Sequence, residues 1–216
     1  MLFVCTISVT KTYIYYAIKR QYIMNSDILN LFAKITTLAK EEVKLIDDCF
    51  TPYHLSKGSY FLKAGEVNRH IGFINIGLVR YFVYKDGEES TFEFTKEGEF
   101  IADYQSFTKK TSSLQNIQAI EDCELSIVNY PNVQRIFNDI KHGNLIGRHI
   151  IEHRFDIMVN QLLAIYMQNH EERYHNFIDK YAAVSQRIPQ YLIASYVGVK
   201  PPSLSRIRKR VSKNIS

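Results

Sequence analysis

The chain has 216 residues and a formal net charge of +5, with 46% hydrophobic and 23% charged residues, so it can bury a core and is not a disordered tail. Nine glycines, five prolines and three cysteines exclude collagen-like proteins and disulfide scaffolds. Cys5, Cys49 and Cys123 form no CxxC pair, so the sequence offers no thiolate set for a structural zinc site or an iron–sulfur cluster. We therefore predict no metal, no other cofactor and a reducing compartment.

The charge is unevenly distributed along the chain. Residues 1–23 carry three basic and no acidic residues, residues 24–179 carry 16 basic against 22 acidic, and residues 180–216 carry eight basic and no acidic residues. A small basic end on a mildly acidic body indicates a module that binds a polyanion. The alternative is a solvated basic tail, but this end also has apolar residues at helical spacing, which disordered tails lack.

The first 23 residues carry neither a good signal peptide nor a membrane span. Their longest apolar stretch, residues 1–9, is about half the length that crosses a bilayer. The positive charges follow this stretch, whereas in a signal peptide they precede it. We expect residues 1–23 to be a non-native or disordered extension and Met24 to be the true initiator; a peripheral membrane anchor is the less favoured alternative.

Two short amphipathic helices are predicted next, one beginning at Ser26, a candidate N-cap, and one around residues 43–46. Residues 51–128 then form short runs rich in aromatic and β-branched residues, separated by turns that contain glycine. This pattern predicts an antiparallel sandwich or barrel. Asp86-Gly87, which lies between two such runs, is the strongest hairpin signal in the chain.

After Pro131 the apolar residues follow a helical period. Five of them recur at alternating steps of four and three, a seam typical of a coiled coil: Ile151, Phe155, Met158, Leu162 and Ile165. We predict a long helix over residues 141–167 that pairs with a second copy of the chain through this seam. The alternative is that the seam belongs to the core of a single chain. Three shorter helices are predicted at residues 171–181, 189–197 and 202–210.

The last two predicted helices have the pattern of a helix-turn-helix. The first ends at Gly198, which is suited to the positive φ of a tight turn, and Pro201 and Pro202 open the second. Leu204 and Ile207 lie on the inner face of the second helix. Its hydroxyl and basic side chains, with one lysine before it, are the predicted DNA contacts: Lys200, Ser203, Ser205, Arg206, Arg208, Lys209 and Arg210. The alternative is a basic helix pair that packs on its own domain.

With these motifs in place, residues 28–210 resemble the Crp/Fnr family of bacterial transcription regulators. The resemblance lies in "SKGSYFLKAGE", "NIGLVRYFV", "KEGEFIADYQSF", the long helix and "IASYVGVKPPSLSRIRKR", in the order of the family. "RIPQ" and "SLSRIRK" are similar to the branch common in Bacteroidetes.

The resemblance implies an α+β fold in which an antiparallel β-roll, a double-stranded β-helix or jelly roll, has flanking helices. It implies a sensor domain of the cyclic nucleotide-binding type over residues 24–140, a dimerisation helix over residues 141–168 and a helix-turn-helix over residues 169–216. It further implies a cytoplasmic homodimer that is not an enzyme and not bound to a membrane, and that acts on palindromic double-stranded DNA together with RNA polymerase.

One departure from the family concerns the effector. Members that bind cyclic nucleotides place an arginine after a Gly-Glu pair to neutralise the phosphate; here Gly98 and Glu99 are present, but residues 111–114 contain no arginine. A phosphate buried without a cation is unfavourable, so we expect the effector not to be cyclic AMP unless Lys109 and Lys110 substitute. Its identity stays open, with three polar residues as candidate contacts: Glu99, Ser113 and Gln115.

A second departure concerns the predicted recognition helix. Pro201 and Pro202 stand where known members place side chains that read bases, so Arg206 is predicted to contact a guanine, and Arg208 and Lys209 to hold phosphates. The sequence ends six residues after Arg210, so we expect the wing that usually follows this helix to be shortened or missing.

The competing interpretation is a small-molecule- or metal-binding β-barrel of the cupin type, with or without enzymatic activity, whose basic end does not read DNA. His149, Glu152 and His153 match the H-x-x-E-H zinc pattern, but no motif places a third ligand, so we interpret them as polar residues that flank the seam. His54 and His70 are the only histidines of the β region, and they are too far apart in sequence to form a closely spaced pair of ligands.

Overall fold

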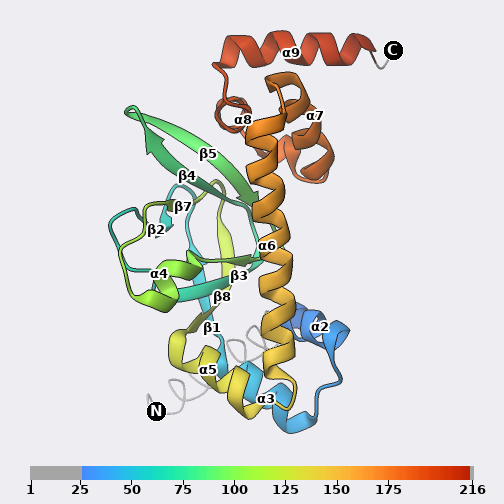
Figure 1. The fold of residues 1–216 in the computed structure, drawn as a ribbon. Helices are drawn as coiled ribbons and strands as arrows, with labels where there is room; N and C mark the ends of the chain where they lie inside the picture. Colours follow the sequence, from blue (N-terminus) through green and yellow to red (C-terminus); the bar gives the residue numbers. More distant parts are fainter. Residues whose placement is uncertain (1–25, 215–216) are drawn as a thin grey trace, which may run out of the picture.

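Strands and helices follow one another along residues 26–214, the part of the chain that the computed structural model describes (Figure 1). The predicted extension at residues 1–23 and the predicted start at Met24 lie outside these residues. The helices are α2 (Ser26–Ile35), α3 (Lys40–Cys49), α4 (Tyr104–Lys109), α5 (Tyr130–Asp139), α6 (Gly143–Met167), α7 (His170–Lys180), the 3-10 helix η1 (Ser185–Arg187), α8 (Gln190–Val197) and α9 (Pro201–Asn214). The strands are β1 (Thr51–Leu55), β2 (Tyr60–Leu62), β3 (His70–Ile76), β4 (Val79–Lys85), β5 (Glu88–Thr95), β6 (Phe100–Ile101), β7 (Asn116–Ala119) and β8 (Cys123–Asn129).

The strands form two four-stranded antiparallel sheets, in the orders β1-β8-β3-β6 and β2-β7-β4-β5. Strands that are adjacent in each sheet are mostly distant in sequence, which is the topology of a jelly roll. The residues that point inward from both sheets form one buried cluster, which includes Ile74, Val79, Ile117 and Leu125. The predicted α+β fold with an antiparallel β-roll is confirmed.

The predicted hairpin at Asp86-Gly87 is also confirmed. Strands β4 and β5 pair along their full length, and the two loop residues have φ values of 53° and 78°. Positive φ at both positions gives the turn whose twist matches that of a two-stranded ribbon. Strand β5 of this hairpin contacts α8, so the ribbon reaches from the β-roll to the C-terminal helices (Figure 1).

A helical layer covers the β1-β8-β3-β6 sheet. Buried residues of α2, α3 and α5 share one cluster with Phe73 of β3 and Ile146 near the start of α6. The sequence did not predict α5 as a helix of its own, although Asn129 caps it through its side chain and Pro131 lies in its first turn. The long helix begins at Gly143 rather than at residue 141. This glycine packs closely against α5, since a Cβ there would lie 2.0 Å from the carbonyl oxygen of Ile136.

Candidate nucleic-acid interface

Helices α8 and α9 are joined by a tight turn whose geometry depends on Gly198. This glycine ends α8 with a φ of 83°, a left-handed conformation that residues with a side chain rarely adopt. Its amide donates to the carbonyl oxygens of Ala194 and Ser195, and α9 begins three residues later at Pro201. The predicted turn between two helices is therefore confirmed.

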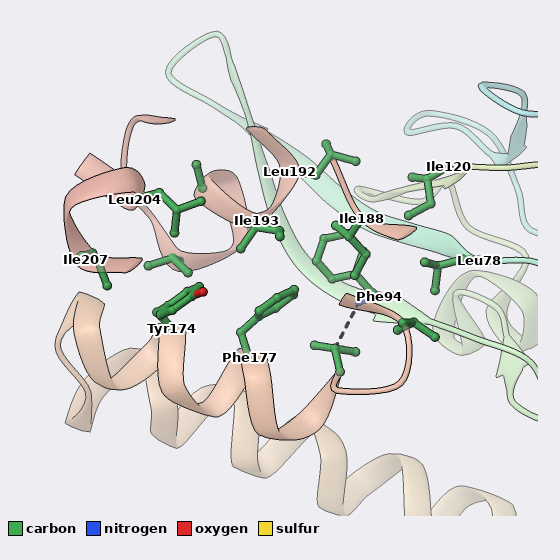
Figure 2. Close-up of a cluster of buried hydrophobic side chains, with 14 of the residues drawn as sticks. Leu78, Phe94, Ile120, Tyr174, Phe177, Ile188, Leu192, Ile193, Leu204 and Ile207 are labelled. Carbon is green, nitrogen blue, oxygen red and sulfur yellow. Dashed lines mark hydrogen bonds between the residues drawn. The ribbon is translucent and has the colours of Figure 1, made fainter. Parts of the chain in front are cut away.

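One face of α9 is buried against the helices before it. Leu204, Ile207 and Val211, spaced three and four residues apart, are buried in a cluster with residues of α7 and α8. Figure 2 shows Leu204 and Ile207 close to Tyr174 of α7. This apolar stripe fixes which face of α9 is left for solvent.

The opposite face of α9 is polar, basic and exposed. At 100° per residue, Ser205, Arg206 and Lys209 lie opposite the buried stripe, and all three are exposed. The guanidinium of Arg206 lies 3.4 Å from the hydroxyl of Ser203, one turn earlier. No acidic residue occurs in α9. The outward face can therefore approach a polyanion without like-charge repulsion from its own helix.

The remaining predicted DNA contacts lie at the edges of this face and have intramolecular partners. Arg208 donates to the side-chain carbonyl of Gln190 at 2.5 Å, and Arg210 pairs with Glu171 of α7 at 2.9 Å. Lys200, in the turn, pairs with Glu88 of the β4–β5 hairpin at 2.5 Å. These partners could not be predicted from local sequence patterns because they are distant in the chain. Exposed pairs of this kind contribute at most about 1 kcal/mol, so a phosphate can replace the carboxylate.

A cleft of about 860 Å³ lies between the start of α7 and α9. Lys200, Arg206 and Arg210 line it together with Glu171 and with His170 and His175 of α7. The cleft therefore joins the outward face of α9 to the first turn of α7. Helix α9 continues to Asn214, so the described residues after Arg210 extend the helix and form no wing strand.

The predicted dimer seam lies on an exposed apolar stripe of α6. Ile151, Phe155, Met158, Leu162 and Ile165 are 44% to 60% exposed. Val159, Leu163 and Tyr166, which the sequence pattern did not include, widen the stripe. Near the start of α6 the stripe continues into a groove of about 460 Å³, which Phe137, Gly147 and Phe155 help to line. An apolar surface of this extent is unusual on a chain that stays alone.

The candidate effector contacts are only partly brought together. The buried hydroxyl of Ser113 donates to the carboxylate of Asp103 at 2.8 Å and accepts the amide of Gln115 at 3.1 Å. Glu99 instead accepts the amide of Lys96, and burial raises the pKa of its carboxyl group. The other carboxylate oxygen of Asp103 accepts the amide of Ser106 and so caps α4. Asp103 was not among the residues predicted from the sequence, although a carboxylate three residues before the amide that it caps is typical of a helix N-terminus.

A buried ion pair that sequence analysis also missed joins α6 to the β-roll. Arg154 of α6 donates to both carboxylate oxygens of Glu93 on β5, at 2.6 Å and 3.1 Å. The side chain of Glu93 is only 4% exposed, and the pair raises the pKa of Arg154 although burial alone lowers it. The pair holds α6 at a fixed position on β5. The one local feature of the sequence that points to this pair is a glutamate between two phenylalanines in a strand.

The histidines singled out in the sequence do not gather into a site. His149 and His153 are exposed on α6, where Glu152 pairs with Arg148 at 3.5 Å. His54 on β1 contacts Glu124 at 3.3 Å, whereas His70 on β3 faces Asn129 at the far end of β8. Among residues 26–214 no three His, Cys, Asp or Glu side chains could hold a metal ion. Over the same residues, no helix has both the length and the apolar character of a membrane span.

Comparisons with known proteins agree with this geometry. Residues 52–139 match the cyclic nucleotide-binding domain family. No curated protein sequence matches the chain.

Solved structures extend the likeness beyond the β-roll. FixK2 from Bradyrhizobium japonicum is 16% identical over 76% of this chain and 85% of its own, with a TM-score of 0.62. A protein assigned to the Crp/Fnr family of transcriptional regulators, from Eubacterium rectale, is 17% identical over 82% of this chain and 85% of its own, with a TM-score of 0.60. The c-di-GMP-responsive global regulator CLP from Xanthomonas campestris is 13% identical over 82% of this chain and 93% of its own, with a TM-score of 0.60. The chain thus combines a match to the cyclic nucleotide-binding domain over residues 52–139 with the overall fold of the Crp/Fnr regulators.

Proposed function

We propose that this protein is a transcription regulator of the Crp/Fnr type, a cytoplasmic homodimer without enzymatic activity that binds palindromic double-stranded DNA and acts together with RNA polymerase. The observation that carries the proposal is the outward face of α9, where Ser205, Arg206 and Lys209 are exposed opposite a buried apolar stripe. A helix held on its apolar side, with hydroxyl and basic groups on the other, is suited to enter a major groove. Residues 24–140 then form the sensor domain, residues 141–168 the dimerisation helix and residues 169–216 the DNA-binding domain.

The side chains of α9 divide by their position. Arg206, near the middle of the outward face, reads a guanine through its two parallel donors. Lys209 on the same face and Arg208 at its edge hold phosphates, which fix the register of the helix on the duplex. Lys200 and Arg210 add phosphate contacts. On binding DNA, Lys200 leaves Glu88 and Arg210 leaves Glu171, and each pairs with a phosphate of the DNA backbone instead.

A second copy of the chain is the partner that fits the apolar stripe of α6. The alternating steps of four and three between Ile151 and Ile165 are those of a helix that pairs with an identical helix in register. Two α6 helices related by a twofold axis would present two α9 helices to half-sites about 34 Å apart, one turn of the duplex.

We propose an effector other than cyclic AMP, or none, for the β-roll. Residues 111–114 supply no cation, and the carboxylate of Asp103 already caps the start of α4. A cyclic phosphate at this place would meet a negative charge in a partly buried site without a cationic partner. An effector of different chemistry would meet Glu99, Ser113 and Gln115.

Selection of binding sites from random duplex DNA tests the proposal. We expect the full chain to enrich a palindrome whose half-sites are about one helical turn apart. The matched variant Arg206→Ala should enrich a motif with weaker preference at one position of each half-site. Failure of the unaltered protein to enrich any sequence, in buffers of low ionic strength, would contradict the proposal.

A further inference from the structure

The helix-turn-helix is docked on the β-roll of its own chain through a continuous apolar core. Leu78, Phe94 and Ile120 of the β-roll are buried in one cluster with Phe177 of α7 and Leu192 of α8 (Figure 2). The core of the DNA-binding end and the outer face of the β-roll are thus one core. A loosely tethered domain would have a core of its own with a polar surface between the two parts.

Phe94 is the centre of this contact. Its ring packs against three aromatic rings, one from α7, one from the residue that follows α7 and one from α8, with centroids 5.5 Å to 6.0 Å apart: Phe177, Tyr181 and Tyr196. The amide of Phe94 donates to the hydroxyl of Tyr181 at 3.2 Å, so the backbone of β5 is held as well as its side chain. Because the packing of aromatic rings is directional, these contacts favour one orientation of α7 and α8 relative to β5.

Hydrogen bonds continue the contact toward the tip of the hairpin. The hydroxyl of Ser195 on α8 accepts the amide of Thr91 at 2.9 Å and donates to the carbonyl of Glu89 at 2.8 Å. The side chain of Ser195 thereby joins α8 to the backbone edge of β5 by two hydrogen bonds. The edge of the sheet is covered and cannot pair with another strand.

Arg187 of η1 closes the other end of the contact. Its guanidinium donates to both carboxylate oxygens of Glu97, at 2.6 Å and 3.1 Å, and also to both of Glu121. Glu97 lies after β5 and Glu121 between β7 and β8, so one side chain ties the DNA-binding end to two turns of the β-roll. The amide of Gly77 donates to Glu97 at 2.9 Å and holds this carboxylate in place. Lysine could not replace this arginine, because only a planar guanidinium reaches two carboxylates in this way.

We propose that Arg187 is a positioning residue that locks the helix-turn-helix onto the β-roll, so that each protomer presents α9 as one rigid body. The inference rests on the proposed function and deepens it. The spacing between two recognition helices is then set by the pairing of the α6 helices, and not by a swing of each DNA-binding end about the junction between α6 and α7. A rigid protomer should tolerate little variation in the distance between half-sites.

A spacing series tests this consequence. Lengthening the selected operator by two base pairs rotates one half-site by about 70°, and we expect the unaltered protein to lose at least about tenfold in affinity. Arg187→Met should bind the best operator almost as well and lose less than about threefold on the longer one, because the apolar core alone holds the end less firmly than the core and the ion pairs together. A direct DNA contact by Arg187 would instead weaken both operators equally, and that result would overturn the proposal.

A distance measurement without DNA separates this proposal from the proposed function. Spin labels at Lys109→Cys on α4 and Tyr191→Cys on α8, both exposed positions, report the separation of the β-roll and the DNA-binding end. Cys49 and Cys123 are buried and their pKa values are raised, so they resist labelling, and Cys5 is replaced by serine. Labelled chains are diluted with unlabelled chains so that only distances within one protomer are recorded.

We expect one narrow distance distribution for the otherwise unaltered chain and a broad one for Arg187→Met. The double substitution Glu97→Gln with Glu121→Gln should broaden it in the same way, whereas Arg135→Met, which removes an exposed pair within α5, should not. An unchanged narrow distribution in Arg187→Met would overturn the lock even if the protein binds DNA. A narrow distribution that broadens in Arg187→Met, in a protein that binds no DNA, would uphold the lock and refute the proposed function.

Discussion

Two apolar surfaces of this molecule have similar side chains, but one is buried within the chain and the other is exposed. On the outer face of β5, Phe94 is 1% exposed because α7 and α8 cover it. On α6, Phe155 is 60% exposed because no part of the described chain covers it. The first surface is complete within one chain and defines where α7, α8 and α9 lie on the β-roll. The second is left uncovered by residues 26–214, and we propose that a second copy of the chain buries it.

The two surfaces also differ in their polar contacts. The covered surface is bordered by Ser195 and by Arg187, whose charge faces two carboxylates. The seam of the uncovered surface, from Ile151 to Ile165, has apolar residues at each of its a and d positions. Ion pairs with good geometry fix the orientation of the two elements that they join. An apolar seam supplies the affinity between two identical helices, and its spacing sets the register in which they pair. We infer that the covered surface fixes the position of α7, α8 and α9 on the β-roll. The uncovered surface is the one through which two chains pair.

The largest expected effect comes from removing the ring at the covered surface. Phe94→Ala should lower the free energy of unfolding by about 3–5 kcal/mol, because it leaves a cavity among the rings of α7 and α8. Denaturant unfolding measures this loss. Phe155→Ala is the matched control and should change the unfolding of dilute chains by less than about 0.5 kcal/mol. Equal losses in the two variants would remove the distinction between the two surfaces.

The next effect falls on the uncovered surface. Leu162→Lys places a charge at the centre of the seam, and we expect the dissociation constant of the dimer to rise at least about thirtyfold, the effect of a central interface residue. Sedimentation equilibrium measures this constant, and the affinity for a palindromic site should fall with it. Lys44→Ala on the exposed side of α3 serves as control. If Leu162→Lys leaves the assembly unchanged, α6 is not the dimer contact.

Local patterns in the sequence predicted most of the fold. The hairpin at Asp86-Gly87, the turn at Gly198 and the buried stripe of α9 each depend on residues within a few positions of one another, and each is present. Helix α5 was missed because its apolar residues lie close to those of α6 in sequence and the short link between the two carries no strong break. The predicted dimer contacts and DNA contacts stay predictions.

Sequence patterns could not show the contacts that hold the parts together. Arg187 lies 90 residues from Glu97 and 66 from Glu121, and Arg154 lies 61 residues from Glu93. No local spacing links such residues, since their proximity follows from the topology of the whole chain. The partners of Lys200 and Arg210 were missed for the same reason.

A smaller effect concerns the proposed reading of bases by α9. Arg206→Ala should reduce discrimination between the selected operator and random DNA by about 1–3 kcal/mol, because it removes a contact to a base. Lys209→Ala should weaken both kinds of DNA alike, as the loss of a phosphate contact does. Competition binding with both duplexes measures the two ratios. Equal loss of discrimination in both variants would contradict the assignment of roles.

The smallest effect tests the burial of the Glu99 carboxyl group through pH. Burial raises the pKa of Glu99, so the folded protein disfavours its charged form. Stability from this group is present in acid and is lost as the pH rises through the raised pKa. Glu99→Gln should therefore raise the melting temperature at pH 7, by up to about 4 °C, and leave it unchanged at pH 4. A lower melting temperature at pH 7 would show that the charge of Glu99 stabilises the fold.

The salt dependence and stoichiometry of DNA binding test the central claim most directly. Fluorescence anisotropy with a labelled palindromic duplex, repeated over a range of salt concentrations, gives both quantities. We predict two chains per duplex and an affinity whose logarithm falls linearly with the logarithm of the salt concentration, because basic residues displace counterions from phosphates. A single chain per duplex, or no binding even in dilute buffer, would contradict a symmetric pair of recognition helices.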